Sequence, residues 1–118
     1  QSYQLFICLD KEIEIVIGKL GTFRFPPGQY IYTGSAKRNI DARIKRHQSN
    51  NKKRRWHIDY FLLHPHTRIL KVIQSDKTEC KLNQLTKGRI IAQRFGASDC
   101  KSKCGSHLKY MGDIAETG

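Results

Sequence analysis

An arginine and a histidine stand four residues apart in this sequence, shortly after a strand-like run that ends in Tyr32-Thr33-Gly34. Residues four apart on a helix share a face, so Arg43 and His47 are expected side by side, next to the end of that strand. A guanidinium can hold a phosphate through two parallel hydrogen bonds, and an imidazole can accept or release a proton near neutral pH. These side chains suit proton transfer at an anionic phosphate compound.

The elements that must position them follow from the hydrophobic pattern. Tyr30 to Thr33 is a compact run of aromatic and β-branched residues, ended by Gly34-Ser35, and predicts a strand. From Asn39 the period changes to three and four, which predicts a helix that Asn39 or Ser35 caps and that ends near Gln48. The candidate residues would then lie at the end of a strand and on the helix that follows it.

The N-terminal part predicts further strands. Tyr3 to Leu9 and Glu12 to Ile17 are rich in apolar residues, and the short polar link between them favours a hairpin. Glycines and prolines break up residues 19–29, which predicts a loop with a short extended piece around Thr22 to Phe25.

The C-terminal part predicts a short helix or a buried strand over 56–63, of which we prefer the helix. A strand over 68–74, a helix over 78–85 and an edge strand over 107–111 are predicted to follow. The helix over 78–85 would place Cys80, Leu82 and Leu85 on one face. Mixed elements after an N-terminal hairpin predict an α+β fold, a small mainly antiparallel sheet flanked by helices. The length of 118 residues predicts a single domain over residues 1–118.

The chain is strongly basic, with 22 Lys and Arg against 10 Asp and Glu and a net charge of +12. Nine positive charges fall between positions 37 and 55, against Asp41 alone: Lys37, Arg38, Arg43, Lys45, Arg46, Lys52, Lys53, Arg54 and Arg55. Clustered positive charge is typical of proteins that bind phosphate backbones, so DNA is the expected partner, with RNA as an alternative. A solvated helix and loop would also account for the charge.

We expect no role at a membrane. The basic run lacks the bulky apolar face of a helix that lies in lipid, and no stretch approaches the roughly 20 apolar residues that span a bilayer. The chain reads as a cytoplasmic protein.

Tyr32-Thr33-Gly34 resembles the second tripeptide of the GIY-YIG nucleases, and Gln1-Ser2-Tyr3 retains the tyrosine of the first. The chain also resembles a GIY-YIG subfamily that occurs alone or fused to endonuclease III-like DNA glycosylases. The segments that carry this resemblance are Trp56-His57-Ile58-Asp59-Tyr60, Glu79-Cys80, Phe95-Gly96-Ala97-Ser98-Asp99-Cys100 and Ser106-His107-Leu108. The resemblance implies a metal-dependent endonuclease acting on DNA, with a link to base-excision repair.

The resemblance also implies roles for single residues. Glu79 would hold a divalent ion, Mg²⁺ or Mn²⁺, and Arg43 would bind the phosphate. Tyr3 and Tyr32 would orient or deprotonate the attacking water, and His47 would share that proton transfer, with the identity of the base left open. We expect these five residues to converge on one face.

Three further residues, Tyr30, Ser35 and His57, are candidates for lining the same cleft. Each site residue also has a plainer interpretation. The tyrosines suit an ordinary half-buried strand, Arg43 and His47 suit a solvated helix face, and Glu79 suits the positive end of a helix. The alternative function is accordingly a non-catalytic nucleic-acid-binding module that keeps the fold.

Four cysteines add one more hypothesis. Cys100, Cys104 and His107 have a spacing compatible with a structural zinc site, to which Cys80 would add a fourth ligand. A disulfide among these three cysteines and free thiols are the alternatives. Cys8 lies in a predicted core strand, where cysteine acts as a small hydrophobe.

Overall fold

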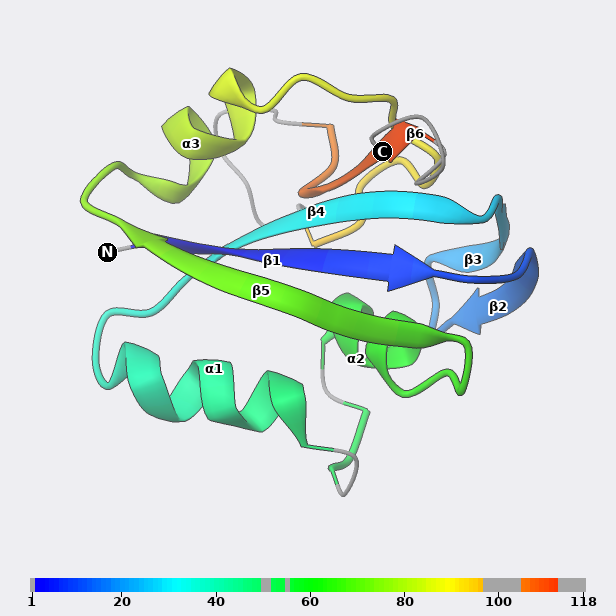
Figure 1. Ribbon diagram of the computed structural model, residues 1–118, viewed down its shortest axis with the longest axis horizontal. Helices are drawn as coiled ribbons and strands as arrows, with labels where there is room; N and C mark the ends of the chain where they lie inside the picture. Colours follow the sequence, from blue (N-terminus) through cyan, green and yellow to red (C-terminus); the bar gives the residue numbers. More distant parts are fainter. Residues whose placement is uncertain (1, 50–51, 55, 97–104, 113–118) are drawn as a thin grey trace.

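The computed structural model describes residues 2–49, 52–54, 56–96 and 105–112. Its elements, in chain order, are β1 (Ser2–Leu9), β2 (Ile13–Ile17), β3 (Gly21–Phe25), β4 (Gly28–Ser35), α1 (Ile40–Gln48), α2 (His57–Leu62), β5 (Thr67–Ser75), α3 (Glu79–Leu85) and β6 (Leu108–Gly112). In the described part of the chain, an antiparallel sheet of order β5-β1-β4-β6 and a two-stranded sheet of β2 and β3 combine with three helices (Figure 1). The predicted α+β class is confirmed.

β1 lies inside the larger sheet and is buried on both faces, between β4 and β5. The predicted hairpin of β1 with the next strand is therefore wrong. β2 pairs instead with β3, from Ile13 opposite Phe25 to Ile17 opposite Gly21. The extended piece expected around Thr22 to Phe25 proves to be β3, the partner of β2.

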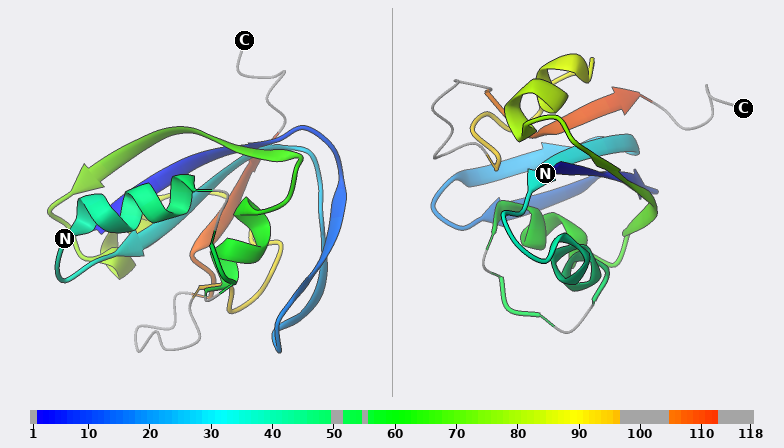
Figure 2. Two further views of the ribbon diagram at one scale, coloured as in Figure 1. Left: turned by 90° about the horizontal axis from the view of Figure 1, so that it is seen from below. Right: turned by 90° about the vertical axis from the view of Figure 1, so that its left-hand side faces the viewer.

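The helices lie on both sides of the larger sheet, with α1 and α2 on one side and α3 on the other (Figure 2). Asn39 caps α1 as predicted, in a left-handed conformation with φ 51°, and its side chain accepts a hydrogen bond from the Ala42 N–H. No helix in the described ranges is long and apolar enough to cross a membrane.

α3 corrects one sequence prediction. Its supposed apolar face is not buried, since Leu85 is 59% exposed and the buried residue of the helix is Asn83. The Asn83 amide donates to the Ser106 carbonyl oxygen at 2.9 Å. The helix packs through polar groups because the side of the sheet that it covers is polar, with Gln4 donating to the hydroxyls of Thr33 and Thr86.

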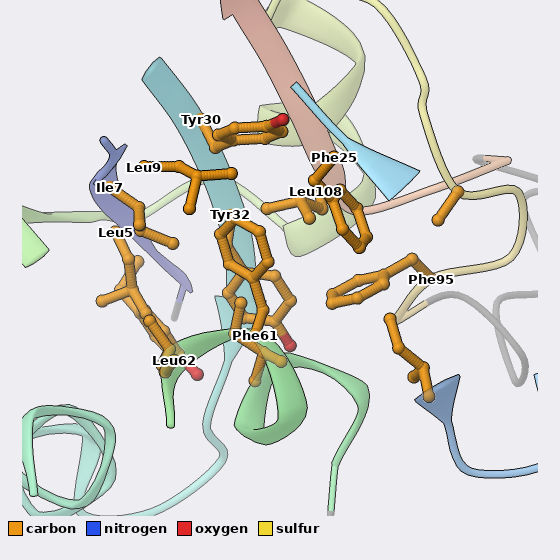
Figure 3. Close-up of a cluster of buried hydrophobic side chains, with 14 of the residues drawn as sticks. Leu5, Ile7, Leu9, Phe25, Tyr30, Tyr32, Phe61, Leu62, Phe95 and Leu108 are labelled. Atoms are coloured by element: carbon orange, nitrogen blue, oxygen red, sulfur yellow. The ribbon is translucent and has the colours of Figure 1, made fainter. Parts of the chain in front are cut away.

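The core fills the space between the sheet and the helices α1 and α2. Leu5, Ile7 and Leu9 reach it from β1, and Tyr30 and Tyr32 reach it from β4 (Figure 3). An edge-to-face aromatic cluster completes it, with ring centroids 5.0 to 6.4 Å apart among Phe25, Tyr30, Phe61, Phe95 and Tyr32. This packing holds the ends of β1 and β4 that carry the candidate site.

Candidate active site

Tyr3 lies directly opposite Gly34 in the β1–β4 pair, and Leu5 lies opposite Tyr32. Because side chains alternate along a strand, these four residues share the face that α1 covers. A side-chain carbon at position 34 would lie 2.5 Å from the Tyr3 hydroxyl oxygen. The glycine of the second tripeptide therefore leaves the space that the Tyr3 ring occupies.

The Tyr3 hydroxyl is 2.6 Å from Nε2 of His47 on α1. Burial raises the pKa of Tyr3, an effect that the positive charge of Arg43 opposes and the negative charge of Glu79 reinforces. The phenol therefore keeps its proton at neutral pH and donates it to Nε2, so we assign the imidazole proton to Nδ1.

His47 is itself buried, with 2% of its surface exposed. Burial lowers its pKa to about 4, and the charge of Lys52 adds to this effect. The imidazole is therefore neutral at physiological pH, and its unprotonated Nε2 can accept the hydrogen bond of the phenol.

Arg43 lies near the same pair on α1. One guanidinium nitrogen donates to the Ser35 carbonyl oxygen at 2.6 Å, and the positive charge of the side chain acts on the Tyr3 hydroxyl. The side chain is half-buried, and none of the ion pairs in the described ranges joins it to a carboxylate. Its positive charge is consequently available to an anion.

Tyr32 on β4 lies beside His47, and the centroids of the two rings are 6.1 Å apart. It is buried, and burial raises its pKa well above the ordinary value, with smaller contributions from Tyr3 and Glu79. Its phenol stays protonated, so it can donate a hydrogen bond but is not itself a base in this structure.

Glu79 approaches from the other side. It is the first residue of α3, which packs on the face of the sheet opposite α1, so the five predicted residues do not come from one face. The turn before α3 adjoins the start of β1, where Ser2 donates to the Lys77 carbonyl oxygen at 2.7 Å. From this end of the sheet, the charge of Glu79 acts on both Tyr3 and Tyr32.

The Glu79 carboxylate lies 3.4 Å from Nδ1 of the buried His107, and its side chain is 28% exposed. No group of three or more His, Cys, Asp or Glu in the described residues could hold a metal ion. A single, partly exposed carboxylate fits Mg²⁺, which binds proteins through one or two carboxylates and keeps several waters.

The sequence of the whole described region matches one family. The family described as Domain of unknown function DUF123 matches residues 2–117. The chain belongs to this family. No curated protein and no solved structure gave a significant match.

The basic residues of this DUF123 chain fall into two groups. The first group is exposed to solvent and consists of Lys37, Arg38, Lys45, Lys53 and Arg54. Arg55 lies outside the described residues. Arg46 and Lys52 make internal contacts. Lys52 donates to the carbonyl oxygens of Arg46 and His47 at 3.2 and 2.7 Å, and so satisfies the C-terminal end of α1.

The three residues proposed to line a cleft have other contacts. Tyr30 is fully buried in the aromatic cluster, and its hydroxyl donates to the Pro26 carbonyl oxygen. Ser35 contributes its carbonyl oxygen to Arg43. His57 accepts a hydrogen bond from the Gly96 N–H at 2.9 Å through Nδ1, and thereby anchors the segment that packs against Tyr32.

Two of the four predicted zinc ligands, Cys100 and Cys104, lie outside the described residues. His107 faces Glu79, and Cys80 follows Glu79 on α3. Cys8 is a buried free thiol in β1, as its strand position predicts.

Sequence reasoning gave no role to Asp59 or Trp56, which prove to be in contact with α1. Asp59 is fully buried, and its carboxylate accepts hydrogen bonds from the two terminal guanidinium nitrogens of Arg46, at 2.9 and 3.0 Å. The guanidinium groups of Arg46 and Arg43 both lie over the Trp56 ring. The available signal was the conspicuous run from Trp56 to Tyr60, which carried the family resemblance.

Proposed function

We propose that this DUF123 chain is a metal-dependent endonuclease of the GIY-YIG type that hydrolyses phosphodiesters in DNA. The observation that carries the proposal is the Tyr3 hydroxyl, which lies 2.6 Å from Nε2 of His47 and feels the positive charge of Arg43. A phenol between a phosphate-binding cation and a neutral imidazole can take a proton from water while it passes its own to the imidazole.

In the proposed reaction, water attacks the phosphorus atom and forms the new P–O bond. Its proton passes to the Tyr3 oxygen as the Tyr3 proton moves to Nε2 of His47. The bond to the leaving oxygen breaks, and that oxygen takes up a proton from solvent. Arg43, which forms no ion pair with a carboxylate in the described part of the chain, stabilises the charge that develops on the phosphate oxygens.

The cofactor of this proposal is a divalent ion, Mg²⁺ or Mn²⁺, held by Glu79. Such an ion supplies charge stabilisation at the phosphate and lowers the pKa of bound water. Glu79 itself contributes the carboxylate and, through its charge, helps to keep the phenols of Tyr3 and Tyr32 protonated.

DNA is the proposed partner because the exposed cations Lys37, Arg38 and Lys45 lie at the start and along the outer side of α1, the helix that also carries Arg43. If one phosphate of a substrate binds Arg43, the adjacent phosphates of the same backbone would therefore lie near these exposed cations. The resemblance to domains fused with endonuclease III-like glycosylases supports a role beside base-excision repair.

The second candidate is a nucleic-acid-binding module without catalysis. One observation favours it: Tyr3 is 1% exposed and His47 is 2% exposed, so the two residues that would move the proton have little contact with solvent. A buried tyrosine–histidine pair also satisfies its own polar groups and stabilises a core.

A cleavage assay separates the two functions. The protein is incubated with labelled intact duplex, abasic, branched and flap DNA and with RNA, with Mg²⁺ or Mn²⁺ and with EDTA. The nuclease proposal expects metal-dependent cleavage of at least one DNA substrate. Binding to these DNAs without cleavage of any substrate would support the binding module instead.

A further inference from the structure

Arg43 and Arg46 stand three residues apart on α1, and their guanidinium carbons lie 4.6 and 4.3 Å from the centre of the Trp56 ring. Trp56 precedes α2 as its N-cap, so the indole joins the two helices. Its ring centroid is also 5.7 Å from that of His47. One aromatic side chain thus contacts three residues of the helix that carries the site.

The two arginines differ in what neutralises them. The two terminal guanidinium nitrogens of Arg46 donate to the buried Asp59 carboxylate, so the charge of Arg46 is neutralised inside the protein. Arg43 has no carboxylate partner among the ion pairs of the described ranges. It is held by a carbonyl oxygen, that of Ser35, and by the indole ring.

This difference matters for an arginine that must bind a phosphate. A carboxylate partner would orient the guanidinium but would compete with the phosphate for it. An aromatic face attracts a cation through its quadrupole and supplies no counter-charge. Trp56 can therefore fix the direction of the Arg43 side chain and leave its charge for a ligand.

Trp56 is itself held firmly. Its backbone N–H donates to the Asp59 carboxylate at 2.8 Å, and the guanidinium that Asp59 binds lies over its ring. Arg46 is fixed further because it donates to the Lys53 carbonyl oxygen at 3.0 Å. Asp59 thus restrains Trp56 both through its backbone and, by way of Arg46, through its ring.

We propose that Trp56, restrained by Asp59 and Arg46, is the positioning residue of Arg43, and that it aims at a substrate phosphate a guanidinium that pairs with no carboxylate of the described residues. The proposal rests on the proposed function for its substrate, while the positioning itself is a property of the free protein. It gives the run from Trp56 to Asp59 a role at the site without requiring it to touch DNA.

The test compares Trp56→Leu, which removes the aromatic face, with Trp56→Phe, which retains one. The matched control is Tyr60→Leu, which removes a half-buried aromatic side chain one turn further along α2, where it faces Arg54 instead of Arg43. Thermal unfolding first identifies the variants that fold.

With the metal-dependent cleavage assay, we expect Trp56→Leu to lower kcat about 100-fold, the scale of a misplaced catalytic group, with a smaller change in KM. Trp56→Phe should recover most of the rate, and Tyr60→Leu should retain it. Equal rates for Trp56→Leu and the wild type, or equal losses in the Leu and Phe variants, would overturn the positioning role.

A second measurement does not depend on cleavage. In the free protein, the Arg43 Nε–H signal in NMR spectra should be ordered in the wild type and in Trp56→Phe, and should become mobile in Trp56→Leu. If the wild type cleaves nothing but this pattern holds, the nuclease proposal fails and the positioning proposal stands. If the signal is equally ordered in Trp56→Leu, the positioning proposal fails whatever the activity.

Discussion

Gly34 faces Tyr3 across the β1–β4 pair, and the phenol ring occupies the space that a side chain at position 34 would need. The contact joins the two tripeptide-like segments of the sequence. It explains why a glycine is needed at Gly34, which has no positive φ that would favour glycine on conformational grounds.

Gly34→Ala should therefore displace the Tyr3 ring, break its hydrogen bond to His47 and destabilise the fold by about 1–3 kcal/mol, the usual cost of overpacking. Chemical denaturation measures the loss. In a Tyr3→Val background, where the ring is absent, the same substitution should cost much less. Equal costs in the two backgrounds would contradict the steric explanation.

His47 provides a prediction on pH. Its folded-state pKa is lowered from 6.5 to about 4, chiefly by burial. Between these values the unfolded chain binds more protons than the folded one, so stability should rise with pH from about 4 to 6.5. A difference of that size corresponds to on the order of 3 kcal/mol.

The measurement is the unfolding free energy of the wild type and of His47→Gln between pH 4 and 7. The slope should be smaller in the variant, which cannot titrate at this position. The groups that act on the His47 pKa, Lys52, Asp59, Arg46 and Arg43, remain in both proteins, so their own titration cancels in the comparison. Parallel pH profiles would show that His47 does not contribute.

Two neighbours on α1, Lys45 and Arg46, should behave differently although both are basic. Arg46→Gln removes the guanidinium that forms an ion pair with the fully buried Asp59 carboxylate and should cost about 3–5 kcal/mol of stability. Lys45→Gln changes an exposed side chain and should alter stability by less than about 0.5 kcal/mol.

For DNA binding we expect the reverse order, with the substitution of Lys45 having the larger effect and that of Arg46 the smaller. If Lys45 contacts a phosphate, its neutralisation should weaken binding to all sequences alike and lower the slope of log affinity against log salt by about 0.9. Fluorescence anisotropy over a salt series measures this. Affinity that does not depend on salt would contradict a phosphate-binding role for the exposed cations.

The sequence pattern predicted those parts of the fold that depend on local periodicity. α1 with its Asn39 cap, β4 and β5 lie where spacing and residue type indicated. Strand pairing was less accessible, because β1 finds its partners far along the chain, with Leu5 opposite Tyr32 and Val72. No local signal specifies such partners, and the short link after β1 favoured a hairpin that does not form.

The candidate site shows the same division. The spacing of Arg43 and His47 predicted their common helix face, whereas the hydrogen bond from Tyr3 to His47 joins residues 44 positions apart and depends on how α1 lies against β1. The role of Trp56 was hidden for this reason too, since its contacts with α1 arise only when α2 packs beside that helix.

Substitutions of Glu79 and Arg43 can distinguish an enzyme from a binding module, because Glu79 is the proposed metal ligand and Arg43 the proposed phosphate-binding cation. Glu79→Gln removes a metal ligand and no phosphate-binding cation, so metal-dependent cleavage should be lost while DNA affinity stays nearly unchanged. Glu14→Gln is the matched control: it makes the same change in net charge at an exposed position on β2. Arg43→Ala should also slow cleavage by roughly 100-fold or more, at a cost on the order of 3 kcal/mol in transition-state stabilisation, the scale of losing one preorganised charge donor. Arg43→Lys should restore little, since lysine keeps the charge but lacks the planar fork that contacts Ser35 and Trp56.

Single-turnover cleavage and anisotropy, measured on the same substrate, separate rate from affinity. A wild type that binds DNA but never cleaves it, together with a Glu79→Gln variant that behaves like Glu14→Gln, would overturn the enzyme and leave the binding module.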